Sequence, residues 1–416
     1  MWKLTKVAAV AAALAAAVAA HAGEVEVLHY WTSGGEAKSA AELKKMMQAK
    51  GHTWRDFAVA GGGGDSAMTV LKSRVISGNP PSAAQVKGPA IQEWASEGVL
   101  GNMDALAKSE KWDEALPKVV ADVMKYKGNY VAAPVNVHRV NWIWASSDAL
   151  KKAGVAAMPK TWDEFFAAAD KLKAAGLIPV AHGGQNWQDF TTFESVVLGV
   201  GGPKFYQDAL VKLDDKALTS DTMKKSLETF RRIKTYTDPG APGRDWNLAT
   251  AMLIQGKAGF QLMGDWAKGE FIAAGKAPGK DFMCAAAPGT ANAFTFNVDS
   301  FILFKLKDAA AQKAQSDLAS AIMSPGFQEV FNLNKGSSPV RAGQSMDKFD
   351  DCAKASAKDF ADTAKSGGLV PSVAHGMAIA PATEGAIKDA VSQFWNDDKV
   401  SVADAMKKIA TAAKTK

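Results

Sequence analysis

The sequence predicts an α/β fold with two domains. Short β-like runs alternate with amphipathic helices along the chain, and this alternation is typical of open, largely parallel sheets. The chain has 416 residues, of which 394 remain once a predicted export segment of 22 residues is removed, and a single hydrophobic core rarely grows to that size. Three extended stretches interrupt the alternation, at 131–144, 285–305 and 334–343. Three crossings of this kind would join two lobes, each built from separate parts of the chain.

The first 22 residues have the pattern of a cleavable signal peptide. Lys3 and Lys6 form a basic start, and residues 7–20 are an unbroken apolar run. Ala20-His21-Ala22 is an Ala-x-Ala cleavage site, so we expect the mature chain to begin at Gly23 and to lie outside the cytoplasm. The run is short for a membrane-spanning helix, which needs roughly 20 apolar residues. An uncleaved membrane anchor is the alternative interpretation.

The overall composition is that of an ordinary globular protein, with 47% hydrophobic and 22% charged residues. Loss of Lys3 and Lys6 lowers the formal net charge from +6 to +4, and basic residues are interspersed with acidic ones, so nucleic acid is not expected as a partner. No cofactor or metal is predicted. The glycine run 61–64 lacks the Lys-Ser or Lys-Thr of a phosphate-binding loop, and the chain has no HExxH or CxxC motif.

The N-terminal domain is predicted to alternate from residue 24 to residue 90. Residues 24–31 form a strand in which Val25 and Val27 point to one side, and 41–50 form a helix. A strand over 52–61 and a helix over 66–78 follow, and 81–90 return toward the sheet. In open α/β sheets ligands bind at the carboxyl ends of the strands. That edge holds Trp31, the glycine run 61–64, Gln85 and Lys87.

The rest of the chain leaves this domain through the extended stretch 131–144. A helix is predicted over 160–176, with Thr161 as its N-cap, Glu164 three residues later and Gly176 beyond its last turn. Further helices are expected at 191–199, 223–236 and 353–368, the last of them exposed. Loop followed by strands is expected over 285–305.

The two cysteines are Cys284 and Cys352. In an oxidising compartment an even number of cysteines favours a disulfide. The loop that this disulfide would close is long, and it would stabilise the fold by roughly 4 kcal/mol in the chain-entropy description. Two buried free thiols are the alternative.

Two tryptophans occur where a ligand could reach them. Trp31 ends the first predicted strand and is followed by glycine and polar residues, and Trp266 lies in the loop-like segment GDWAKGEF. An indole beside hydrogen-bonding groups suits the weakly apolar faces of a sugar ring. Packing in a core is the alternative for each ring.

Seven segments, in order, carry a resemblance to a known family: LHYWTSGGEAK, AAQVKGPAIQEW, AAPVNVHRVNWIWASSDALKKAGV, PKTWDEF, MGDWAKGEF, FNVDSFILF and NKGSSPVR. Together they resemble the extracellular solute-binding proteins of bacterial ABC sugar importers, and among these the periplasmic glucose-binding proteins. The resemblance implies a periplasmic binding protein fold with three hinge crossings and ligand in the cleft between the lobes. Lobe I would comprise 23–133 and 293–336, and lobe II 134–292 and 337–416. It also implies a monomer that delivers sugar to membrane permease subunits.

The resemblance assigns roles residue by residue. Trp31 and Trp266 would stack on opposite faces of a hexose. Polar contacts would come from Glu36, Gln85, Lys87, Asp299, Lys335 and His375. Asp299 sits in an otherwise apolar strand, where an unpaired carboxylate is costly, so a ligand or cation contact is expected there, with Lys335 as a partner across the sugar. Taken alone, Glu36 could be a surface carboxylate, Lys87 a solvated loop lysine and His375 a core residue. His138 and Asn136 could contact the ligand or serve the hinge.

The predicted function is therefore binding of a monosaccharide, with glucose as the first candidate. Another solute in the same fold, such as a different hexose or a short oligosaccharide, is one alternative. An enzyme is the other alternative, because Glu36 and Asp299 could be imagined as a glycosidase pair. No catalytic signature accompanies them: AHGG at 181–184 is not joined by a G-x-S-x-G motif. We therefore expect a binding protein and no catalysis.

Overall fold

The structure, a computed structural model, describes residues 22–415. The predicted signal peptide lies outside these residues apart from Ala22, so its cleavage stays a prediction. No helix within 22–415 combines the length and the apolar character needed to cross a membrane.

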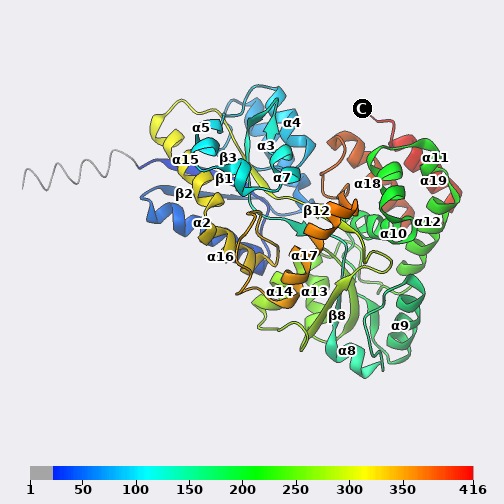
Figure 1. Cartoon of the computed structure of the whole chain (residues 1–416). Helices are drawn as coiled ribbons and strands as arrows, with labels where there is room; N and C mark the ends of the chain where they lie inside the picture. Colours follow the sequence, from blue (N-terminus) through cyan, green and yellow to red (C-terminus); the bar gives the residue numbers. More distant parts are fainter. Residues whose placement is uncertain (1–21, 416) are drawn as a thin grey trace, which may run out of the picture.

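Two bodies lie side by side in Figure 1, each around its own sheet and its own hydrophobic clusters. We call the body around the five-stranded sheet the first lobe. Its strands, in spatial order, are β2 (Thr53–Ala58), β1 (Glu24–His29), β3 (Ala83–Gln85), β13 (Ser300–Leu303) and β6 (Ala132–Pro134). Its larger helices are α2 (Gly34–Ala49), α3 (Asp65–Ile76), α4 (Pro89–Ser96), α15 (Ala309–Met323) and α16 (Pro325–Lys335). Shorter elements complete it: η1 (Gly62–Gly64), α5 (Asp104–Ser109), α6 (Trp112–Ala115), α7 (Lys118–Val123), β4 (Lys125–Tyr126) and β5 (Asn129–Tyr130).

The second lobe surrounds a four-stranded sheet of β11 (Phe282–Ala286), β8 (Trp142–Ser146), β10 (Ala258–Leu262) and β9 (Ile178–Val180), in that order. Its helices are α8 (Ser147–Lys152), α9 (Trp162–Ala174), α10 (Asn186–Tyr206), η2 (Gln207–Val211), α11 (Asp215–Leu218), α12 (Asp221–Lys234), α13 (Trp246–Ile254), α14 (Ala267–Ala273), α17 (Asp351–Ser366), α18 (Pro381–Asn396) and α19 (Val402–Ala412). A third sheet has three strands, which are β14 (Leu369–Pro371), β12 (Phe294–Asn297) and β7 (His138–Arg139) in spatial order.

The first sheet is parallel except at β13. Strands β1, β2 and β3 run in the same direction, as the strand–helix alternation predicts, whereas β13 is antiparallel to both β3 and β6. The physical reason lies in where β13 begins. The chain comes from the second lobe and enters the sheet at the edge where β3 ends, so it can only run back in the opposite direction.

Three chain crossings connect the lobes, and they are hydrogen-bonded to one another. The first runs between β6 and β7, the second between β12 and β13, and the third follows α16. Val135 N–H donates to the carbonyl of Asp299 at 2.7 Å, and the N–H groups of Val137 and Ser338 each donate to the other's carbonyl, at 2.8 and 2.9 Å. The residue limits that the sequence predicts for the lobes stay a prediction. Strand β12 lies in the range 293–336 that is predicted for lobe I. Its Phe294 and Phe296 side chains pack in the first lobe's core, whereas its backbone pairs with β7 and β14.

Helix ends follow the local sequence. Thr161 caps α9 as predicted, because its hydroxyl accepts the N–H of Glu164 at 3.2 Å. Helix α2 begins at Gly34, seven residues before the predicted start at residue 41. Its first turn is stabilised by Glu36, whose carboxylate accepts the N–H of Ser33 at 3.4 Å and that of Thr32 at 3.2 Å. Ser33 is therefore the N-cap of this helix, and Gly34 and Gly35 are its first two residues.

The predicted disulfide is confirmed. Cys284 on β11 is bonded to Cys352 in the first turn of α17. The bond closes a loop between residues 68 apart in the sequence and fastens the segment that follows the third crossing to the second lobe's sheet. It leaves no free cysteine in the part of the chain that the structure describes.

Candidate functional site

A cavity of about 340 Å³ lies between the lobes. Its wall contains seven of the eight predicted ligand-contacting residues: Trp31, Glu36, Lys87, Trp266, Asp299, Lys335 and His375. Gln85 lies just behind the wall, where its Oε1 accepts the N–H of Tyr30 and its Nε2 donates to Asp299 Oδ1, both at 3.2 Å. The structure thus brings together residues that are up to 344 positions apart, from Trp31 to His375. Their role toward a ligand stays a prediction.

The two tryptophans come from different lobes, and each contacts other aromatic rings. Trp31 follows β1, is only 2% exposed, and contacts the rings of Phe301 and Phe331 at centroid distances of 5.5 and 5.1 Å. Trp266 is the residue before α14 and is 6% exposed, with its ring 4.8 Å from that of His375. Both tryptophans are therefore buried, as the core-packing alternative expects, and both also border the cavity.

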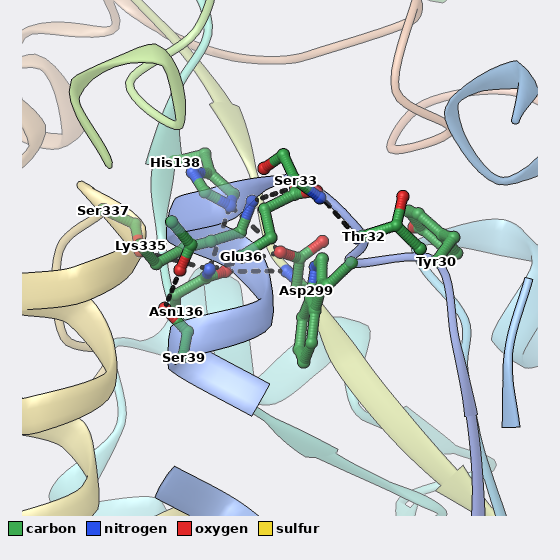
Figure 2. A network of polar contacts seen from close by, with 12 residues as sticks. Tyr30, Thr32, Ser33, Glu36, Ser39, Asn136, His138, Asp299, Lys335 and Ser337 are labelled. Atoms are coloured by element: carbon green, nitrogen blue, oxygen red, sulfur yellow. Dashed lines mark hydrogen bonds and ion pairs between the residues drawn. The ribbon is translucent and has the colours of Figure 1, made fainter. Parts of the chain in front are cut away.

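Glu36 and Lys335 form an ion pair at the cavity wall, with Lys335 Nζ 2.6 Å from Glu36 Oε1 (Figure 2). Glu36 lies in the first turn of α2. Lys335 is the last residue of α16, which ends at Gly336 in the left-handed conformation, with a φ of 87°. The pairing of Lys335 with Asp299 across a bound sugar stays a prediction. The end of α16 packs against the start of α2, so the carboxylate nearest to the ammonium is that of Glu36.

Asp299 lies at the second crossing and accepts hydrogen bonds from three side chains. Its carboxylate accepts from Gln85 Nε2 at 3.2 Å, from Asn136 Nδ2 at 3.2 Å and from His138 Nε2 at 3.0 Å. Burial works to raise the pKa of Asp299, but the charges of His138, Lys87 and Lys335 outweigh it and hold the pKa far below its usual value. The carboxylate is therefore ionised and accepts hydrogen bonds only.

His138 and Asn136 tie the three crossings together (Figure 2). His138 lies between two buried carboxylates, because its Nδ1 is hydrogen-bonded to Asp265 and its Nε2 to Asp299. Burial lowers the pKa of His138, but Asp265 and Asp299 outweigh it and raise the pKa above its usual value. Asn136 Nδ2 also donates to Ser337 Oγ at 3.2 Å. These contacts favour the hinge interpretation for both residues, although His138 also borders the cavity.

Lys87 and His375 reach the cavity from opposite lobes. Lys87 Nζ has no hydrogen-bond or ion-pair partner among residues 22–415 and lies 5.5 Å from the centre of the Tyr30 ring. Burial lowers the pKa of Lys87, although Asp299 and Glu384 oppose this effect. His375 Nε2 lies 3.0 Å from Thr191 Oγ1. Burial, together with the nearby charge of Lys87, places the pKa of His375 well below its usual value, so this imidazole is neutral.

Sequence reasoning missed two polar groups of the wall that have no partner. Asn297, at the end of β12, is 2% exposed, and its buried Oδ1 accepts no hydrogen bond from the described chain. Ser33 Oγ is also buried without a partner. Both border the cavity. Asn297 could have been found from the segment FNVDS, because it stands two residues before Asp299 and an extended chain presents alternate residues to the same side. The wall also contains Trp187, Gln185 and residues 245–247, which carry no comparable signal in the sequence.

The arrangement combines acceptors, donors and apolar ring surface around one small space. Glu36 and Asp299 accept hydrogen bonds, and Lys87 and Lys335 donate them, whereas the hydroxyls of a neutral polyol do both. A glycosidase needs one of its two carboxyls protonated, and Asp299, with its pKa held low, cannot be that acid. Within 22–415 no cluster of three or more His, Cys, Asp or Glu side chains is placed to hold a metal ion. The wall thus presents hydrogen-bond acceptors, hydrogen-bond donors and aromatic rings to the same cavity.

Comparison with known proteins gives consistent matches. The family of bacterial extracellular solute-binding proteins matches residues 31–319. The chain is 48% identical over 420 residues to a probable sugar-binding periplasmic protein of Brucella suis, with 99% of each chain covered. It is 25% identical over 255 residues to a glucose-binding protein of Saccharolobus solfataricus, covering 58% of this chain and 45% of that one.

Among solved structures, a chitin oligosaccharide binding protein superposes with a TM-score of 0.78 at 18% identity, covering 94% of this chain and 98% of that chain. At this identity the likeness concerns the fold alone. It confirms the predicted α/β periplasmic binding protein fold.

Proposed function

The chain belongs to the family of bacterial extracellular solute-binding proteins, and from this membership we propose that it captures a monosaccharide, with glucose as the first candidate, and delivers it to the permease of an ABC importer. It is a periplasmic sugar-binding protein of an ABC transporter and acts by binding rather than by catalysis. The periplasmic location agrees with the export signal predicted at residues 1–22.

The observation that carries the proposal is the composition of the cavity wall. Carboxylates, ammonium groups and indoles from both lobes line a space of about 340 Å³, among them Glu36, Asp299, Lys87, Lys335, Trp31 and Trp266. Hydrogen bonds to charged groups contribute about 1.5–3 kcal/mol each, more than bonds between neutral groups. A sugar of the wrong epimer would leave one of these buried groups unpaired, and this penalty is the source of discrimination.

Glucose is placed first because the chain resembles glucose-binding relatives, one of which is the Saccharolobus solfataricus protein. Another hexose or a short oligosaccharide remains the alternative. In this proposal the sugar shifts the balance between open and closed lobes, because it makes its better contacts in the closed form. The permease then recognises the closed form.

The test is calorimetric titration with a panel of hexoses, followed by the substitutions Trp31→Ala and Trp266→Ala. We expect glucose to bind most tightly and each substitution to weaken its binding at least tenfold, about 1.4 kcal/mol, because each removes ring surface from the site. Trp94→Ala is the matched control, since Trp94 packs against Phe304 and does not border the cavity.

Undiminished glucose binding in both cavity variants would refute the stacking assignment. A chromogenic glycoside provides the check on the enzyme alternative. Turnover that disappears with Asp299→Asn would contradict a binding role for that carboxylate.

A further inference from the structure

The imidazole of His375 makes one hydrogen bond within residues 22–415, and its partner is Thr191. Nε2 of His375 lies 3.0 Å from the hydroxyl oxygen of Thr191, which is 1% exposed on α10 and does not border the cavity. The other ring nitrogen, Nδ1, makes no hydrogen bond with the described residues, yet it is not among their fully covered polar atoms. Nδ1 is therefore the ring nitrogen that a ligand can reach.

The hydroxyl of Thr191 has a second contact that decides which atom donates. Its Oγ1 lies 2.8 Å from the carbonyl oxygen of Trp187, one turn earlier in α10, and a carbonyl oxygen can only accept. Because a hydroxyl has a single proton, that proton goes to Trp187 when both contacts are hydrogen bonds. The proton between Thr191 and His375 then belongs to Nε2, and Thr191 accepts it.

The opposite assignment satisfies fewer groups. If Thr191 donated to Nε2, its contact with Trp187 would have no proton, and the proton of the neutral imidazole would lie on Nδ1 without an acceptor among the described residues. A buried N–H without an acceptor is costly, whereas an unused lone pair costs less. The number of hydrogen bonds therefore favours a proton on Nε2 and a lone pair on Nδ1.

The charge of Lys87 favours the same assignment. Burial and this positive charge place the pKa of His375 well below its usual value, so the imidazole carries one proton and not two. Lys87 and His375 border the same cavity, and an ammonium group attracts a lone pair and repels an N–H. A lone pair on Nδ1 thus agrees with the electrostatics of the cavity as well as with the hydrogen bonds.

Packing fixes the direction of the imidazole ring. The indoles of Trp266 and Trp187 lie 4.8 and 5.8 Å from it, both in an edge-on arrangement. Glu194, one turn after Thr191 on α10, accepts the N–H groups of the two residues that precede His375, at 2.9 and 3.1 Å. The same helix therefore holds both the ring of His375 and the backbone that leads to it.

We infer that Thr191 is a positioning residue for sugar binding: it keeps the proton of His375 on Nε2, so that Nδ1 accepts a hydrogen bond from a hydroxyl of the sugar. The hydrogen bond at one ring nitrogen sets the protonation of the other. The inference rests on the proposed function, because it takes the occupant of the cavity to be a sugar. It adds a requirement to that function: the ligand group next to His375 must have a proton to donate, so a hydroxyl fits there and a fluorine does not.

The first experiment locates the proton by NMR of the full mature chain without sugar. The nitrogen chemical shifts distinguish a protonated from an unprotonated ring nitrogen, and the signals of His375 are those that disappear in His375→Gln. We expect a proton on Nε2 and none on Nδ1. Thr191→Val keeps the shape of the side chain and removes the hydroxyl, so we expect it to populate both tautomers, whereas Thr191→Ser should restore the Nε2–H form.

The second experiment is calorimetric titration of the same variants with glucose. We expect Thr191→Val to weaken binding about three- to tenfold, because one hydrogen bond between neutral groups is partly lost, and Thr191→Ser to restore it. Thr192→Val is the matched control. Thr192 is the next residue of α10 and equally buried, and its hydroxyl has no hydrogen-bond partner in the described chain. Its removal should change neither the tautomer nor the affinity.

Fluorinated sugars test the direction of the hydrogen bond. A glucose analogue in which fluorine replaces one hydroxyl cannot donate at that position. We expect one position at which fluorine weakens binding about tenfold in the unmodified chain and has little effect in His375→Ala, because the acceptor is already absent from that variant.

The outcomes that would overturn the inference can be told apart. A proton on Nδ1 in the unmodified chain would contradict it directly. Weaker glucose binding in Thr191→Val with an unchanged tautomer would assign Thr191 a structural role only. Equal fluorine penalties in the unmodified chain and in His375→Ala at every position would show that Nδ1 accepts no sugar hydroxyl. If no sugar binds although the proton lies on Nε2 and shifts in Thr191→Val, the proposed function fails while the effect of Thr191 on the imidazole stands.

Discussion

Asn297 is a buried polar side chain of the cavity wall whose hydrogen-bonding capacity is unused. Its amide borders the cavity and makes no hydrogen bond with residues 22–415. We expect Asn297→Ala to weaken glucose binding by about three- to tenfold, because one neutral hydrogen bond contributes about 0.5–1.5 kcal/mol. Titration calorimetry measures the change. Asn129→Ala, at an exposed asparagine of β5, is the control, and an unchanged affinity in Asn297→Ala would show that the amide does not contact the sugar.

At the level of single residues, the sequence predicted charged and aromatic groups better than neutral ones. Trp31 and Asp299 stand out because an indole at a strand end and a carboxylate in an apolar strand conflict with their surroundings. Asn297 and Ser33 do not, since an asparagine or serine at the end of an element is common in any protein. The partner of Lys335 could not be predicted either, because it depends on how the end of α16 meets the start of α2 in space.

Helix α10 holds the loop that carries His375 through one buried carboxyl group. The two oxygens of Glu194 accept from Ser372 Oγ at 2.6 Å, from the N–H groups of Val373 and Ala374 at 2.9 and 3.1 Å, and from Tyr206 Oη at 2.8 Å. Burial raises the pKa of Glu194 to about 7 from its usual 4.5, although these four donors act to lower it. The loop of residues 372–374 is thus fixed to α10 immediately before the site residue.

This shift predicts how stability depends on pH. Between pH 4.5 and 7 the folded protein keeps a proton on Glu194 that the unfolded chain releases, so the free energy of unfolding falls as the pH rises through this window. The contribution is about 3 kcal/mol, fully present below pH 4.5 and lost above pH 7. Glu194→Gln cannot ionise, and we expect urea unfolding of this variant to depend less on pH from 5 to 8.

Glu228→Gln, at an exposed position of α12, is the matched control and should behave as the unmodified chain does. Equal pH dependence in Glu194→Gln and in the control would show that the buried carboxyl does not change its protonation in this range.

At the level of elements, the order of strands and helices could be predicted, whereas their ends and directions could not. The first β–α–β–α–β run is present, and α9 begins and is capped as expected. Helix α2 starts early because Glu36, considered as a ligand residue, also caps the helix. The direction of β13 depends on the edge at which the chain re-enters the sheet, and no local pattern in residues 300–303 encodes it.

The two lobes meet closely where α14 of the second lobe lies against α2 and α16 of the first. Gly35 N–H donates to Glu270 Oε1 at 2.9 Å, and a Cβ atom on Gly269 would lie 2.7 Å from the carbonyl oxygen of Asn334 and 2.9 Å from that of Lys335. These neighbours are backbone atoms, so a side chain at Gly269 would have to displace the end of α16.

We therefore expect Gly269→Ala to weaken glucose binding more than tenfold, because it moves Lys335 and separates the lobes at their junction. Small-angle scattering should show a smaller decrease in the radius of gyration on addition of glucose than in the unmodified chain. Gly326→Ala, at the start of α16, is the control, since a Cβ atom there meets no other atom within 4 Å. If Gly269→Ala binds glucose normally and compacts to the same extent, this contact does not govern closure.

At the level of the whole molecule, length and the three extended stretches were enough to predict two lobes with several connections. The way the crossings hold one another could not be predicted, because Asn136, Asp299 and Ser337 come together from three distant parts of the sequence.

The position of β13 at the inside of the first sheet has a consequence for the biogenesis of the protein. Strand β13 lies between β3 and β6, so a nascent chain shorter than about 300 residues lacks the strand that joins them. Pairings between such distant residues form slowly. The first lobe therefore cannot finish folding while most of the polypeptide is still being made, because the strand that joins β3 to β6 is among the later parts of the chain to be synthesised.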